Sequence, residues 1–282
     1  AIGLTLIFGV LRIPNFAHGD LMTWGAYLAL FGLTLLPAGP PLAPFSFGAE
    51  LLVLLVLVMP LVGLTGYLLD RLVFRRLRAR RAPSVILAMA ALGGAFLLRS
   101  VIYLGWGADF RNFYTGRPRP AVELFAGIRV RPDQLFILGL ALLLIFLVYL
   151  LLERTKMGKA MRATSDNADL ARISGIDTES VIRWTWLIGG GLAGAGGVMF
   201  ALDTQLRPEM GWWLMLPLFS SVILGTIGHA YGALLGALVI GVVWQMSTAF
   251  LNPAYGPGVA FVVLILVLLF RPQGIFGKPG GA

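Results

Sequence analysis

The chain has 282 residues, of which 58% are apolar and 12% charged, whereas average soluble domains are roughly 45–50% apolar and 25% charged. It has no cysteine and two histidines, which excludes disulfides and a zinc site of three or four N or S ligands; metal and redox chemistry are not expected. A net charge of +9 is also found in nucleic-acid-binding proteins. Here the arginines are confined between apolar runs, which is typical of membrane topology signals instead. The composition predicts an all-α, polytopic transmembrane bundle that forms a single domain over 1–282.

The order of uncharged stretches predicts the membrane passes, because a helix needs about 20 residues to cross ~30 Å of hydrocarbon. The opening run 1–11 is too short, and we expect it to be the remainder of a truncated first helix. Residues 210–270 contain no Lys, Arg, Asp or Glu and hold three passes, with breaks near 228–229 and at 252–257. The first of these, 214–228, is short enough to be re-entrant. Together with five separate stretches, this predicts eight complete passes plus the fragment; the five are 21–36, 51–69, 83–105, 135–152 and 184–202.

The distribution of basic residues predicts the orientation, because cytoplasmic loops retain Lys and Arg. With 71–81 inside, alternation also places 12–20, 153–183 and the tail after Phe270 inside, and these segments hold 15 of the 22 basic residues. Six lie outside, five of them in the loop 106–133. The remaining one, Arg99, lies within a predicted span, and we expect it to snorkel outward.

Small residues indicate how the helices pack, because backbones approach closely in lipid where Gly or Ala replaces larger side chains. A G-x-G-x-x-G pattern at 189–194 has no preceding strand and lies within a span, so helix packing is favoured over dinucleotide binding. No P-loop occurs, so nucleotide-driven work must come from another chain. The predicted packing positions are Gly190, Gly194, Gly228, Gly232 and Gly236.

A polar break separates the opening run from the first complete pass. Interrupted helices expose polar backbone within a membrane only where they line a cavity or are buried in protein, so the break is a candidate solute path. The alternative is a surface turn with a solvated His18 and with Asp20 capping the next helix. The candidate residues are Asn15, Phe16, His18, Gly19 and Asp20.

The inside segment 153–183 is a candidate docking element. Ser165 or Asp166 is expected to cap a short helix, Leu170 and Ile173 to form its apolar edge, and Gly175 to end it in the left-handed conformation. The next helix is expected to start at 177 or 178. A free helix of about ten residues is marginal in water, which favours a partner surface over a solvated connector, although both remain open. The candidate coupling residues are Arg162, Ala163, Ser165, Asp166, Asn167, Ala168, Leu170, Ala171, Ile173 and Gly175.

Three segments, 3–20, 162–176 and 269–277, resemble the branched-chain amino acid ABC transporter permeases of bacteria and archaea. The Asn-Phe-Ala-His-Gly run at 15–19 resembles the first of the two paired permease subunits. The resemblance implies a non-enzymatic, multi-pass subunit of a prokaryotic cytoplasmic membrane that works by alternating access. Its implied partners are a homologous second permease, two cytoplasmic ATPase subunits and a periplasmic or extracellular solute-binding protein, with ATP used by the partners and no cofactor in this chain. By the same resemblance, 162–175 is the coupling helix and the loop 106–133 faces the binding protein.

Other functions remain open at this point. The cargo is expected to be leucine, isoleucine, valine or a related solute, but the same family could carry urea or short amides. A lipid-active membrane enzyme would need paired ionisable groups at one depth, since charges within a membrane are costly and usually functional. A passive channel would instead allow solute flux without ATPase subunits.

Overall fold

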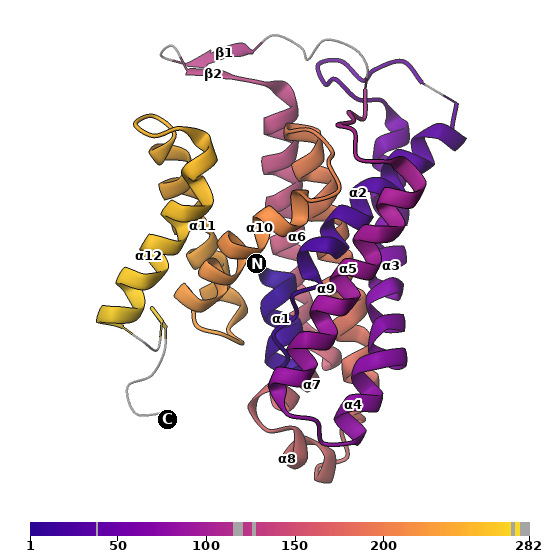
Figure 1. The fold of residues 1–282 in the computed structure, drawn as a ribbon, viewed down its shortest axis with the longest axis vertical. Coiled ribbons are helices and arrows are strands. Elements are labelled where there is room, and N and C mark those ends of the chain that lie inside the picture. Colours follow the sequence, from indigo (N-terminus) through magenta and orange to yellow (C-terminus); the bar gives the residue numbers. More distant parts are fainter. Residues whose placement is uncertain (38, 115–120, 126–127, 272–273, 277–282) are drawn as a thin grey trace.

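The computed structural model describes residues 1–37, 39–114, 121–125, 128–271 and 274–276, and it is helical along most of its length (Figure 1). A π-helical turn, Asp70–Phe74, joins α3 to α4, and a 3-10 turn, Pro253–Tyr255, precedes α12. A small antiparallel hairpin is formed by β1 (Val122–Phe125) and β2 (Ile128–Val130), with Val122 opposite Val130. The helices are α1 (Ile2–Leu11), α2 (His18–Leu35), α3 (Ala49–Leu69), α4 (Arg75–Ala79), α5 (Ser84–Trp106), α6 (Pro132–Arg154), α7 (Lys156–Asp166), α8 (Ala168–Ile173), α9 (Thr178–Asp203), α10 (Met210–Leu224), α11 (Ala230–Ser247) and α12 (Gly256–Phe270).

Six helical segments of the described chain are long and apolar enough to cross a membrane: 49–79, 84–106, 132–154, 178–203, 230–247 and 253–270. They confirm the helical membrane bundle, and the helices around them confirm breaks near 228–229 and 252–257. The predicted total of eight complete passes is not confirmed. The ten residues of α1 extend ~15 Å and the 15 of α10 ~22 Å, both less than the ~30 Å of hydrocarbon.

Helix α9 is the central element of the bundle. Within its spanning window 61% of the residues are buried, compared with 17–39% for the other five spans, and it packs against α3, α2 and α1. A Cβ added at Gly190 would lie 2.8 Å from the Cα of Gly63 in α3, and one at Gly25 of α2 would lie 2.6 Å from the Cα of Gly194. Gly190 and Gly194 therefore lie at close backbone contacts of α9 with α3 and α2.

Helices α10 and α11 form a second close pair. A Cβ at Gly232 would overlap the carbonyl oxygen of Gly225, the residue after α10, and a Cβ at Gly236 would overlap that of Ser221 in α10, so both glycines lie where the two helices meet. The prediction that Gly228 is a packing position within a helix is wrong. Gly228 lies in the turn before α11 with a φ of +84° and faces Gly9 of α1, because the chain must reverse direction there.

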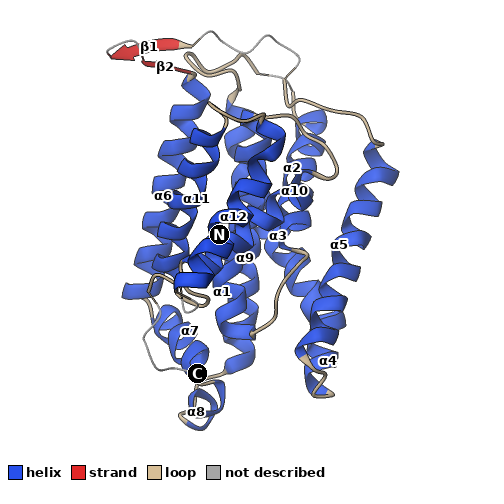
Figure 2. Cartoon of the chain, turned by 60° about the vertical axis from the view of Figure 1, so that its left-hand side comes forward, coloured by secondary structure: helices blue, strands red, loops and turns tan. Residues whose placement is uncertain are grey.

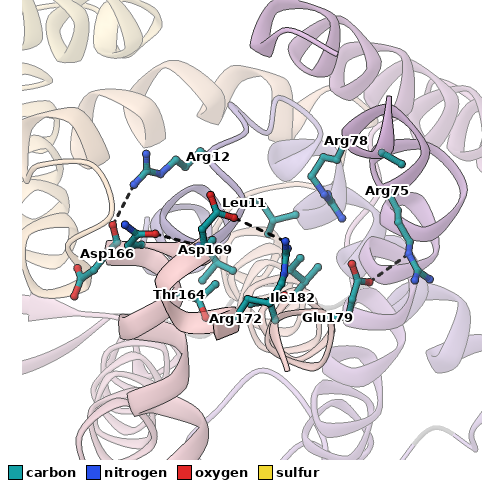
Figure 3. A pocket seen from close by; sticks show the side chains of 15 residues that line it. Leu11, Arg12, Arg75, Arg78, Thr164, Asp166, Asp169, Arg172, Glu179 and Ile182 are labelled. Carbon is teal, nitrogen blue, oxygen red and sulfur yellow. Dashed lines mark hydrogen bonds and ion pairs between the residues drawn. The ribbon is translucent and has the colours of Figure 1, made fainter. Parts of the chain in front are cut away.

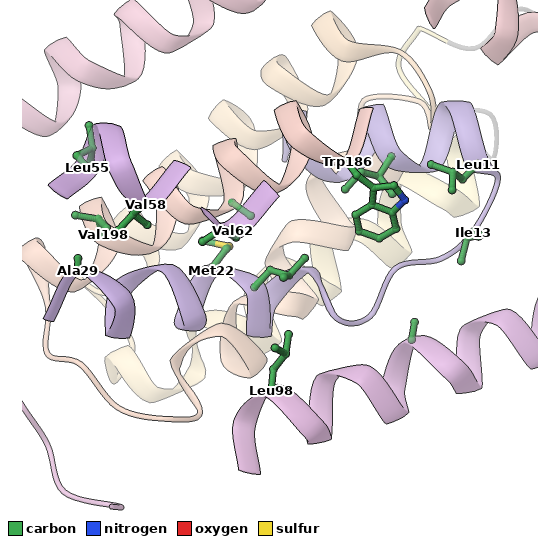
Figure 4. Close-up of a cluster of buried hydrophobic side chains, with 14 of the residues drawn as sticks. Leu11, Ile13, Met22, Ala29, Leu55, Val58, Val62, Leu98, Trp186 and Val198 are labelled. Carbon is green, nitrogen blue, oxygen red and sulfur yellow. The ribbon is translucent and has the colours of Figure 1, made fainter. Parts of the chain in front are cut away.

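The largest buried apolar cluster joins α1, α2, α3, α5 and α9 and surrounds the start of α2 (Figure 4). Trp186 of α9 is 1% exposed and stacks on Phe74 of the π-helical turn, with ring centroids 5.8 Å apart. Helix α5 packs chiefly against α2 and stands at the edge of the bundle in Figure 2. The β-hairpin and the pair α7–α8 lie at opposite ends of the molecule (Figure 1).

Candidate functional site: a helix break inside the bundle and a helical hairpin at its end

The connection between α1 and α2 turns back into the bundle. At the end of α1, Arg12 donates from Nη2 to the carbonyl oxygens of Ser165 (3.5 Å) and Asp166 (3.4 Å) in α7. The chain then returns through Ile13 to the first residue of α2, His18 (Figure 4). The side chain of His18 and the backbone of Gly189 both lie against Gly3.

The contact at Gly189 sets the depth of the break. Helix α9 is 26 residues long, ~39 Å, and Gly189 comes 11 residues after its start, ~17 Å along it. The break therefore reaches the middle of the central helix.

The polar residues of the break are buried: Asn15 and Asp20 are 0% exposed and His18 is 2% exposed. This burial overturns the alternative of a surface turn with a solvated histidine, and it corrects the expectation that the whole of 12–20 lies in the cytoplasm. The residue types predict a turn, but they do not show that the chain re-enters the bundle before the helix starts. The Nδ2 atom of Asn15 and the Nδ1 atom of His18 have no hydrogen-bond partner in the described structure.

The two remaining candidates of the break connect it to α10. The ring of Phe16 lies 5.1 Å from that of Phe219. The backbone of Gly19 packs against Gly211, whose N–H donates to Thr23 Oγ1 at 3.0 Å. Phe16 and Gly19 thus form a junction between the break and α10, and Asn15, His18 and Asp20 are buried beside it.

A bidentate ion pair joins this junction to α5. Arg99 donates from Nε and Nη2 to the two carboxylate oxygens of Asp20, at 2.9 and 3.0 Å. The side chain of Arg99 is 12% exposed, and its guanidinium carbon lies 5.5 Å from the ring centroid of Phe96 and 5.0 Å from that of Trp212. Asp20 is also in the first turn of α2, where the helix dipole favours a negative charge.

The expectation that Arg99 snorkels outward is wrong. A carboxylate 79 positions away in the sequence lies at the same depth, so the guanidinium pairs inward with it. Sequence analysis therefore missed Arg99 as a site residue, although a single charge within an apolar span is a signal that could have found it.

The segment 153–183 forms two short helices and the start of α9. Asn167 caps α8, since its Oδ1 accepts from the N–H groups of Asp169 (3.1 Å) and Leu170 (3.0 Å). The prediction that Ser165 or Asp166 is the cap is wrong, because both belong to the last turn of α7. Asp177 caps α9 as expected.

The apolar edge and the end of α8 are as predicted. Leu170 is 56% exposed and Ile173 is 81% exposed, whereas Ala171 between them is buried. Gly175 ends the turn with a φ of +84°. Helix α8 therefore presents two exposed aliphatic side chains at the tip of the molecule.

Polar side-chain contacts hold helix α7 against α6 and α11. Arg162 pairs with Glu153 of α6 (2.7 Å), and Tyr231 of α11 donates to the same carboxylate at 2.8 Å. The hydrogen bond that Arg162 donates to Glu153 holds the pKa of the Arg162 guanidinium above its usual value. Arg162 and Ala163 thus belong to a helix packed on α6, while α8 projects beyond it (Figure 1).

A groove of about 800 Å³ separates α8 from α4 (Figure 3). Its walls carry both signs of charge: Arg75 of α4 pairs with Glu179 of α9 at 3.3 Å, and Arg172 of α8 lies 3.8 Å from Asp169. Arg12 lines the same groove, so the end of the break that follows α1 opens beside α8.

Comparison with known proteins places this chain in a family. The profile of a family described as "Branched-chain amino acid transport system / permease component" matches residues 1–268. The chain belongs to this permease family. It is an integral membrane protein, and the resemblance found in its three sequence segments is confirmed.

Curated relatives are similar over nearly the whole chain. It is 30% identical to the high-affinity branched-chain amino acid transport system permease protein BraD of Pseudomonas aeruginosa, over 99% of the chain and 91% of the relative. It is 32% identical to the probable branched-chain amino acid transport permease protein LivH of Methanocaldococcus jannaschii, over 98% and 87%. It is 27% identical to the LivH permease of Escherichia coli, over 99% and 90%. No solved structure matches the chain.

Proposed function

We propose that this permease is a membrane-spanning subunit of an ATP-driven importer that carries branched-chain amino acids across the cytoplasmic membrane of a prokaryote. Family membership and the names of the relatives support the cargo. The observation that carries the ATP-driven part is α8, a six-residue helix with exposed Leu170 and Ile173 at the end of the bundle. A helix this short needs a partner surface, and exposed aliphatic side chains suit a protein groove.

The partners follow from the same proposal. Two cytoplasmic ATPase subunits hydrolyse ATP, and one of them receives α8 together with the coupling residues between Arg162 and Gly175. A homologous second permease completes the membrane part. A periplasmic or extracellular solute-binding protein docks at the opposite end, where the β-hairpin lies. The chain itself is a transport subunit without enzymatic activity or a cofactor.

The contacts of the break indicate how movement of α8 reaches the solute path, which we assign to Asn15, Phe16, His18, Gly19 and Asp20. Arg12 holds the end of α7 through two carbonyl oxygens, and the chain from Arg12 leads directly into the buried break. Displacing α7 and α8 therefore pulls on the start of α2 and on its partner α10. ATP and the loaded binding protein drive alternating access when each of them favours one of the two packings.

Reconstitution tests the proposal. Proteoliposomes that contain this chain, the second permease and both ATPases should accumulate labelled leucine when ATP and the binding protein are supplied, and isoleucine and valine should compete. Uphill accumulation by this chain alone, or leucine flux without the ATPases, would refute the coupled mechanism. Competition by urea or short amides, but not by isoleucine or valine, would show that the cargo is one of these solutes and not a branched-chain amino acid.

A further inference from the structure

The pair Asp20–Arg99 lies where a charged group is hard to accommodate. Charges at membrane depth are costly, and they are found there mainly in paired or functional positions. A well-packed apolar contact of similar volume is often as stable as a buried ion pair, so helix packing alone does not require these charges. The guanidinium can still donate further hydrogen bonds. Its Nη1 has no hydrogen-bond partner among the described residues, and 12% of the side-chain surface is exposed.

Unpartnered polar atoms continue along α2 from this pair towards the outer end of α5. Asp20, Trp24 and Tyr27 are spaced by four and three residues and share one face of the helix. Tyr27 is 0% exposed, yet its hydroxyl has no hydrogen-bond partner in the described structure, and neither has Trp24 Nε1. The ring of Tyr27 meets Trp106, the last residue of α5, at 5.5 Å. Buried polar groups are normally paired, so these atoms point to a polar ligand along this face.

We propose that Asp20 and Arg99 bind the charged backbone of the transported amino acid, with the solute's ammonium group on the Asp20 carboxylate and its carboxylate on the Arg99 guanidinium. This inference rests on the proposed function and specifies the ligand class of the solute path. Phe96 and Trp212, whose rings lie next to each other beside the guanidinium with centroids 6.4 Å apart, provide the apolar surface for an aliphatic side chain. The ion pair opens when the solute enters and closes when it leaves, so both charges stay paired throughout.

The test measures solute binding without the binding protein. The complete complex of this chain, the second permease and the ATPases is placed in lipid nanodiscs, and equilibrium binding of radiolabelled leucine is measured. The neutral double variant Asp20→Asn with Arg99→Gln keeps a polar contact between α2 and α5 but removes both charges. Hydrogen bonds to charged groups are stronger than those between neutral groups, so we expect leucine affinity to fall at least about tenfold. Isopentylamine, which lacks the carboxylate, and 4-methylpentanoate, which lacks the amine, should each compete at least about tenfold less well than leucine.

The chain contains a matched control. Arg78 donates to Asp70 with the same two-bond geometry, at 2.6 and 3.0 Å, and Asp70 is 2% exposed, but this pair lies at the cytoplasmic end of the α3–α4 helix. The variant Asp70→Asn with Arg78→Gln should bind leucine as the unaltered complex does. A neutral Asp20–Arg99 variant that binds leucine within about threefold of the unaltered complex would overturn the proposal. So would equal competition by either analogue, absence of leucine binding by the unaltered complex, or failure of the variant to assemble while the control assembles.

Uptake by the same purified complexes, measured in proteoliposomes with ATP and the binding protein, separates this site from the proposed function. If the unaltered complex binds leucine through the pair but shows no ATP-driven uptake, the importer function fails and the site stands. If uptake is normal and the neutral variant transports and binds as the unaltered complex does, the site fails and the importer function stands.

Discussion

The end of α8 offers a change that separates coupling from folding. Gly175 has a φ of +84°, and no atom lies within 4 Å of a Cβ added there. The Cβ added by Gly175→Leu therefore meets no neighbouring atom, and the cost of the substitution is the left-handed backbone conformation, roughly 1–2 kcal/mol for an L-residue. Such a cost reduces the population of this helix end about 5- to 30-fold relative to competing conformations. The buried core is not touched, so the bundle is expected to remain folded.

The assay compares leucine uptake with solute-stimulated ATP hydrolysis in proteoliposomes. We expect Gly175→Leu to lower the number of solutes carried per ATP, because α8 no longer holds the orientation that its partner recognises. The matched control is Ser174→Leu, which places the same side chain one residue earlier at an ordinary φ of −80°. Wild-type uptake and wild-type stimulated hydrolysis in Gly175→Leu would show that this loop does not couple. An equal loss in Ser174→Leu would assign the effect to the leucine side chain.

Three further predictions concern docking, packing and orientation. Ile173→Asp places a charge at an 81% exposed position and should reduce co-purification of the ATPase at least about tenfold, whereas Ser174→Asp should not. If both variants retained the same amount of ATPase, the apolar edge of α8 would be excluded as a contact. Gly211→Ala should prevent assembly or markedly lower the melting temperature, because its Cβ would overlap the carbonyl oxygen of Gly19, whereas Gly241→Ala has open space and should leave the melting temperature unchanged or higher; the reverse order would contradict the α2–α10 contact. In this cysteine-free chain, a cysteine replacing Ser174 should react with an impermeant maleimide only from the cytoplasmic side and one replacing Asp109 only from the opposite side; labelling of both from one side would disprove the orientation.

Several local features of the site could be predicted because short-range chemistry determines them. Gly175 ends a turn because it accepts a positive φ, and Asp177 caps α9 because its carboxylate accepts from the next turn. The cap of α8 was misplaced by one or two residues, since Ser165, Asp166 and Asn167 are all good caps and the choice depends on where α7 ends. Choosing among adjacent caps needs the packing of α7 on α6, which the local sequence does not contain.

The amino-acid sequence alone determined that this protein is a helical membrane bundle, where most of its helices break, and that it resembles a permease family. These properties depend on apolar length, turn residues and short motifs, all of which act over a few neighbouring residues. Only the tertiary structure decided that the polar break lies at the middle of α9 rather than at the surface, and that Arg99 meets Asp20. The depth of the break and the pairing of Arg99 depend on how helices distant in the sequence pack. The partner of a single charge in a span lies on another helix, and packing decides which carboxylate lies at the same depth.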